Sequence, residues 1–246
     1  LRTRPYAYRM RDLANSLALR AERDAHPLLR SGGMGKKVGI IVITSDRGLC
    51  GGFNANIVNG LMRAIANQFE GKEVEITVVG KKGIELLRRR SCTVRGSYTQ
   101  VHDGSVMDTA GQIIDDMVAE FMKGETAEVY CLYNEFKSAI SQKVTLEKLL
   151  PFEPQSDDGQ VTIDYLYEPT SEEVFDQLLA RHMQVQMHRI LNESAASEYG
   201  ARMTAMDAAT QNAGDVIGRL TLQYNRARQD AITKELIEVV SGAEAL

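Results

Sequence analysis

The feature that most constrains the fold is a long stretch without proline, from Ser171 to Leu246. Ser171 is followed by Glu172 and Glu173, which is typical of a helix start. A single helix over 171–246 would extend roughly 110 Å at 1.5 Å per residue. That length is several times the width of the domain that the preceding residues can form. We therefore predict a projecting helix that needs a partner helix or a surrounding sleeve to cover its apolar stripe.

Apolar and small residues recur along this helix at alternating steps of three and four, which predicts a coiled-coil seam. Gly200 and other glycines inside the helix each cost about 1 kcal/mol relative to Ala, but small residues also let two helices approach closely. The alternative is a break at Gly200 that gives a two-helix hairpin. The seam comprises Met203, Met206, Thr210, Ala213, Ile217, Leu220, Tyr224, Ala227 and Ala231, and the apolar positions then shift to Ile232, Leu236, Val239 and Ala243.

The residues before the long helix alternate between strand and helix patterns, which predicts an α/β domain with a mainly parallel sheet and helices on its faces. Val38–Thr44 is a continuous apolar run, as in a strand covered on both faces. A first helix is expected over 5–30, ended by His26-Pro27 and a glycine-rich linker. Further strands are expected over 74–80, 92–98, 127–136, 142–150 and 161–169, and helices over 54–69, 81–90 and 105–123.

Composition excludes several classes of function. The net charge of −4 gives no reason to expect nucleic acid as a partner. Residues 1–37 carry nine Lys or Arg against three Asp or Glu, so this segment either meets an acidic partner or is a solvated helix face. No apolar run is long enough to span a bilayer.

Neither a metal site nor a cofactor site is predicted. The three cysteines are far apart, the four histidines have no metal-ligand spacing, and His182 and His188 are expected to be exposed or partly packed. The stretch DRGLCGG follows a strand but lacks the Gly-Lys-Ser/Thr ending of a phosphate-binding loop. The glycines of this stretch favour a tight turn whose backbone comes close to a neighbouring part of the structure or to another subunit. Cys50, within it, has no nearby His or Asp pattern to make it a nucleophile.

Two motifs and one shorter stretch carry a resemblance to a known family. The stretch that begins RMTAMDAATQ at Arg202 closely resembles the C-terminal helix of the γ subunit of F-type ATP synthase. SDRGLCGGFN and YLYEP are also similar to the family, and the resemblance covers essentially the whole chain. Its C-terminal signature is matched at Ile232, Thr233, Glu235, Glu238, Gly242, Ala243 and Ala245.

The resemblance implies a fold of three parts. Residues 1–30 would be part of an N-terminal helix whose first turns precede Leu1, residues 38–168 a Rossmann-like, mainly parallel sheet domain, and residues 171–246 a long helix. The two terminal helices would form an antiparallel coiled coil. The first turns of the N-terminal helix would then be the partner that the seam requires.

The resemblance also implies a rotor function without covalent chemistry. The helix pair would turn inside a hexamer of three α and three β subunits, and the sheet domain would meet the ε subunit and the c-ring. The complex would be peripheral, on the cytoplasmic face of a bacterial plasma membrane. The other candidates are a plain scaffold with a coiled-coil arm and an enzyme of the doubly wound type.

Three groups of site residues follow from the resemblance. Arg202, Arg228 and Gln229 match positions that contact the β catch loops, although intrahelical pairs such as Arg226–Asp230 are an alternative use of such charges. The expected tip in the α3β3 collar comprises Ile232, Thr233, Glu235, Val239, Val240, Ala243 and Leu246. The expected foot contacts with ε or the c-ring are Asp46, Arg47, Cys50, Tyr165, Tyr167 and Glu168, the tyrosines being equally well explained as core beside Phe152.

Overall fold

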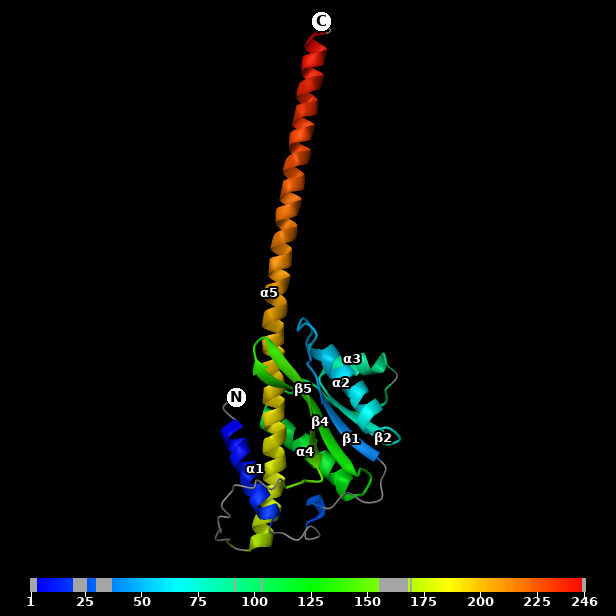
Figure 1. The fold of residues 1–246 in the computed structure, drawn as a ribbon, viewed down its shortest axis with the longest axis vertical. Coiled ribbons are helices and arrows are strands. Elements are labelled where there is room, and N and C mark those ends of the chain that lie inside the picture. Colours follow the sequence, from blue (N-terminus) through cyan, green and yellow to red (C-terminus); the bar gives the residue numbers. More distant parts are fainter. Residues whose placement is uncertain are drawn as a thin grey trace.

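The fold consists of a five-stranded sheet domain and one very long helix that leaves it at one end (Figure 1). It is seen in a computed structural model. The structure describes residues 4–19, 26–29, 37–90, 92–102, 104–154, 168 and 170–244.

The sheet has the strand order β3-β2-β1-β4-β5. Strands β1, β2, β3 and β4 pair in parallel, and β5 closes the edge antiparallel to β4. In the register of the centre, Ile40 of β1 lies opposite Ile76 of β2 and Tyr130 of β4. The strands are β1 (Lys37–Ile43), β2 (Glu73–Val79), β3 (Val94–Tyr98), β4 (Glu128–Ser138) and β5 (Ser141–Leu150).

Helices cover both faces of the sheet, which explains the uninterrupted apolar sequence of β1. Alternate β1 side chains enter two different cores. Val38, Ile40 and Val42 pack with α2 (Phe53–Gln68) and α3 (Lys81–Arg88). Ile41 and Ile43 pack on the other face, with α4 (Val106–Met122) and the long helix α5 (Ser171–Glu244).

Helix α1 (Arg4–Ala18) lies antiparallel on the first half of α5, as predicted. Its Arg4 pairs with Glu193, and its Ala7 accepts a hydrogen bond from Gln186. Because the α5 partner number falls as the α1 number rises, the two chains run in opposite directions. Small and apolar α1 residues, including Ala7 and Ala14 at 0% exposure, form the contact face.

The first helix is shorter than predicted. It ends at Ala18, and Pro27–Leu29 form a separate 3₁₀ turn instead of the end of a helix to residue 30. Pro27 disfavours helical geometry at the residue before it. The turn is held by the Leu28 amide, which donates to His26 Nδ1, and it buries Leu28 in the core.

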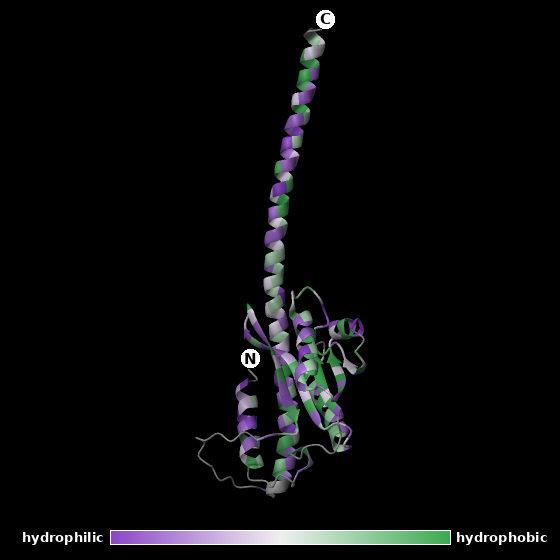
Figure 2. Cartoon of the chain, turned by 45° about the vertical axis from the view of Figure 1, so that its right-hand side comes forward, coloured by the Kyte–Doolittle hydropathy of each residue, from purple (hydrophilic) through white to green (hydrophobic). Residues whose placement is uncertain are grey.

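Helix α5 runs without a break for 74 residues, so the hairpin alternative at Gly200 is wrong. Gly200 instead makes room for the β4–β5 hairpin, because a Cβ there would lie 3.0 Å from the Ala139 carbonyl oxygen. Beyond this point the helix leaves the domain. From Met206 to Ala243 every side chain except Asn225 is exposed, and apolar and polar residues alternate along the shaft (Figure 2).

Several predictions fall outside the described residues: the strand over 161–169, and the side chains of Tyr165, Tyr167 and Leu246. His182 is a correction, because it is buried at 3% exposure rather than exposed or partly packed. Within the described parts of the chain, no helix is both long and apolar enough to cross a membrane.

Candidate functional site

The loop after β1 is built as a compact polar turn at the carboxyl edge of the sheet. Ser45 donates its amide to Asn54 Oδ1 at 2.9 Å, and Asn54 Nδ2 lies 3.3 Å from Cys50 Sγ. The Asp46 carboxylate accepts hydrogen bonds from the backbone amides of Lys81 and Gln100. Asp46 therefore ties together the three loops that follow β1, β2 and β3.

Helix α5 lies across the place where a doubly wound sheet ordinarily binds its ligand. Strand order reverses between β1 and β4, and ligands of such folds bind beyond the carboxyl ends of the strands at this point. Here Cys50, Phe53 and Ala201 form a small buried cluster. Ser197, on the same helix, donates to the Asn134 carbonyl in the second half of β4. The long helix thus packs against this crevice and forms one wall of the cavity that remains beside Cys50 and Asn134.

The three predicted β-catch residues lie at two levels of α5. Arg202 lies where the helix leaves the sheet domain, 2.6 Å from Glu198 and 3.4 Å from the Gly48 carbonyl oxygen. Arg228 and Gln229 are exposed and lie about 39 Å farther along the axis at 1.5 Å per residue. Arg202 therefore realises the intrahelical alternative through Glu198, whereas the described structure shows no ion pair between Arg226 and Asp230.

The predicted foot residues do not form one surface. Asp46 and Arg47 line a cleft together with Arg202, near the point where α5 leaves the domain. Glu168 is exposed just before α5 begins, roughly 45 Å away along the helix. Cys50 is 2% exposed beneath α5, so in this structure it offers no surface to a partner.

The predicted tip residues that the structure describes are all exposed on the far part of α5. Val239 and Val240 are 70% and 56% exposed, and Ile232 is 49% exposed. Thr233, Glu235 and Ala243 share this environment. Exposed apolar surface of this kind is typical of an interaction site.

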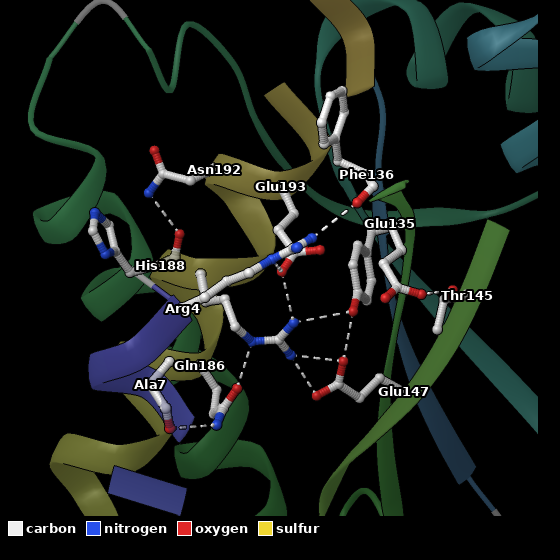
Figure 3. Close-up of polar contacts among 12 residues, drawn as sticks. Arg4, Ala7, Glu135, Phe136, Thr145, Glu147, Gln186, His188, Asn192 and Glu193 are labelled. Atoms are coloured by element: carbon white, nitrogen blue, oxygen red, sulfur yellow. Dashed lines mark hydrogen bonds and ion pairs between the residues drawn. The ribbon is translucent and has the colours of Figure 1, made fainter. Parts of the chain in front are cut away.

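A buried polar cluster between the helices and the sheet was not predicted (Figure 3). Its centre is Arg189 of α5, 6% exposed, which forms a bidentate ion pair with Glu147 of β5 at 2.7 and 2.8 Å. Burial opposes the charge of the guanidinium, but Glu147 outweighs it and the pKa of Arg189 is raised. Burial, reinforced by Glu147, raises the pKa of Tyr133 beside it. The sequence signal for this cluster is the pair Arg189 and Glu193, which lie four residues apart among apolar residues of the helix.

Comparison with known proteins places the chain in one family. A family model described as ATP synthase matches residues 1–246. A protein described as ATP synthase gamma chain, from Anaeromyxobacter sp. (strain Fw109-5), is 46% identical, with 100% of this chain and 86% of the relative covered. The protein of the same description from Geobacter metallireducens is 44% identical over 99% of this chain and 85% of its own length.

Solved structures share the fold. A chain of the Euglena gracilis mitochondrial ATP synthase, in an assembly of OSCP, F1 and c-ring, matches with a TM-score of 0.68 at 19% identity, covering 99% of this chain and 88% of its own. A central-stalk and c-ring structure of the Tetrahymena thermophila enzyme gives a TM-score of 0.59 at 24% identity, covering 85% and 97%.

Proposed function

Because the chain belongs to the family of ATP synthase gamma chains, we propose that it is the central rotor subunit of an F-type ATP synthase. In this role it couples rotation of a c-ring, driven by proton flow, to the conformational cycle of catalytic sites on the surrounding β subunits. Run in reverse, ATP hydrolysis would drive the shaft. The chain itself makes and breaks no covalent bond.

The observation that carries the proposal is the exposed second half of α5. From Met206 onward its apolar side chains have no cover among the described residues. Hydrophobic burial contributes about 25 cal/mol per Å², so a helix of this kind gains much stability inside a protein sleeve. A hexamer of α and β subunits around the helix would supply such a sleeve.

The composition of the C-terminal end of α5 suits a surface that must turn against the surrounding subunits. Val239, Val240 and Ala243 form no directional bonds, and side chains of this size fit an apolar collar without interlocking. Strong ion pairs at the same place would hold the shaft in one orientation. We assign seven residues to this seat: Ile232, Thr233, Glu235, Val239, Val240, Ala243 and Leu246.

Rotation also needs polar contacts that form with one β subunit at a time. A hydrogen bond to a charged group is worth about 1.5–3 kcal/mol, which biases a conformation and is still reversible. Arg228 and Gln229 are exposed on the shaft and free to make such contacts. Arg202 would act at a separate, lower level, next to the sheet domain.

The sheet domain would meet the ε subunit and the c-ring at the end from which α5 starts, near Glu168. Tyr165 and Tyr167 belong to the same proposed contact. Asp46 and Arg47 lie at the opposite end of the domain, so they would face the α and β subunits or a partner beside them. The complex would be peripheral, on the cytoplasmic face of a bacterial membrane.

An enzyme of the doubly wound type receives less support, because α5 packs over the crevice at the carboxyl ends of β1 and β4. A scaffold with a coiled-coil arm explains the exposed helix, but not the family membership. Copurification with α and β subunits separates the rotor from such a scaffold.

The test is reconstitution of the complex from this chain with α and β subunits. We expect one copy per α3β3 hexamer. Arg228→Ala combined with Gln229→Ala should lower the ATPase rate at least threefold while the complex stays intact. The matched control is Gln211→Ala with Asn212→Ala, two exposed positions on the same helix, which should leave the rate within about 30%. A chain that stays monomeric beside intact α and β subunits would refute the proposal.

A further inference from the structure

The buried cluster around Arg189 links four elements through one connected set of polar contacts (Figure 3). Arg189 bonds both oxygens of Glu147 on β5, and its Nη1 also lies 3.3 Å from the Tyr133 hydroxyl on β4. Its Nε donates to Gln186, and its Nη1 donates to Glu193, both on α5. All three guanidinium nitrogens are therefore used.

The same cluster reaches the first helix. Glu193 Oε1, shared with Arg189, also accepts from Arg4 Nε at 3.0 Å. Arg4 Nη2 donates to the Phe136 carbonyl of β4 at 2.9 Å, and Gln186 donates to the Ala7 carbonyl of α1. Helix α1 is thus bonded to α5 and to the sheet at the same place.

The charges balance, since two guanidinium groups face two carboxylates. The Glu193 side chain is 2% exposed, and its Oε2 has no hydrogen-bond partner among the described residues. A buried network of this kind contributes little to stability compared with apolar residues of the same shape. The network instead fixes the orientation of the helices relative to the sheet, because its hydrogen bonds break when one helix turns about its axis.

Resting on the proposed rotor function, we propose that Arg189 is a positioning residue that fixes the rotational setting of α5 and α1 on the sheet. Apolar packing alone lets a helix turn or slide by small steps at low cost. The Arg189–Glu147 fork and the shared Glu193 resist this movement. Torque then passes between the sheet domain and the shaft with little twist lost at their junction.

The principal variant combines Arg189→Met, Glu147→Met and Tyr133→Phe, which removes one positive and one negative charge together and leaves Arg4 paired with Glu193. It should fold with nearly the stability of the parent chain, because both partners become apolar. A second variant, Arg189→Lys, keeps the charge but loses the fork geometry. The matched control is Arg95→Met, because Arg95 also binds carboxylates on two elements, Glu75 and Glu120, without touching α1 or α5.

The first measurement records the angular fluctuations of a particle attached to the sheet domain in the complete complex. The far end of α5 is cross-linked to the hexamer, so that the fluctuations report twist between the sheet domain and the shaft. We expect the variance of the particle's angle to rise at least twofold in the triple variant and by less in Arg189→Lys. Arg95→Met should match the parent. A folded, assembled triple variant with the parent's variance would overturn the proposal.

The second measurement needs no partner subunit. Spin labels at Arg9→Cys on α1 and Lys143→Cys on β5, both exposed positions, report the setting of α1 on the sheet in the full chain, with Cys92→Ser to remove the partly exposed thiol. The distance distribution should be at least 1.5-fold wider in the triple variant. An unchanged width refutes the anchor even where the chain assembles normally. If the parent chain fails to assemble with α and β subunits and the distance distribution is wider in the triple variant, the rotor function is refuted and the anchor role of Arg189 stands.

Discussion

At the scale of single residues, the buried His182 makes the stability of the chain depend on pH. Its ring packs edge-on against Phe152 at a centroid distance of 5.2 Å, and its Nδ1 has no hydrogen-bond partner among the described residues. Burial, helped by the nearby charges of Arg11 and Arg189, lowers the pKa of His182 to about 4. In the unfolded chain the value is about 6.5, so the unfolded state takes up a proton first as pH falls.

The sign of the effect follows from this difference. Between pH 6.5 and pH 4 the unfolded state binds more protons, so the free energy of unfolding falls as pH falls. We expect His182 to account for a loss of about 2 kcal/mol between pH 7 and pH 5. In His182→Leu this part of the loss should disappear, as measured by urea denaturation at both pH values. His188→Leu, a less buried site on the same helix, should keep most of it. An equal pH dependence in parent and His182→Leu would contradict the assignment.

At the scale of elements, α5 depends on a glycine where it passes the β4–β5 hairpin. A Cβ at Gly200 would lie 3.0 Å from the Ala139 carbonyl oxygen and 3.2 Å from its Cα, both backbone atoms. We expect Gly200→Val to lower the free energy of unfolding by about 1–3 kcal/mol, because the hairpin must shift. Gly218→Val on the same helix is the control, since a Cβ at Gly218 meets nothing within 4 Å. Urea denaturation of the sheet domain checks both, and equal stabilities would show that the hairpin yields freely.

Elements with a strong local pattern could be predicted from the sequence. The apolar run of β1, the alternating strands and helices that follow it, and the proline-free α5 all appear where expected. The end of α1 did not follow from the pattern, because the residues up to Leu29 keep an apolar spacing while Pro27 starts a separate turn. Local periodicity reports a buried face, but not the residue at which tertiary packing stops the helix.

The site was less predictable because it depends on which elements lie together. Arg189 and Glu147 are 42 positions apart, and no local spacing links them. The resemblance predicts that the loop with Asp46 lies at the same foot as Glu168, but the parallel sheet places this loop at the opposite end of the domain. The burial of His182 likewise depends on α1 and Phe152, which approach α5 from distant parts of the chain.

For the molecule as a whole, the two halves of α5 should differ in local stability. Residues from Phe175 to Ala201 pack on the sheet and on α1, whereas those from Met206 onward are exposed. A helix without tertiary packing is only marginally stable in water. We expect amide hydrogens of 206–243 to exchange at least a hundredfold faster than those of 175–201 in the isolated chain. Assembly with α and β subunits should slow exchange over 206–243, and equal protection in both halves of the isolated chain would contradict this view.

The length of α5 beyond its last contact with the domain makes the junction a fulcrum. Gly51 faces Ala205 there, and from Ala205 to Glu244 the helix extends about 60 Å at 1.5 Å per residue. By lever geometry, a tilt of about 1° at the fulcrum displaces the far end by about 1 Å, which is comparable to the gap between two packed side chains. A side chain that shifts by half an ångström near Gly200 is therefore magnified severalfold at Val240. The accuracy with which the far end meets its surroundings is set by packing that lies tens of ångströms away from it.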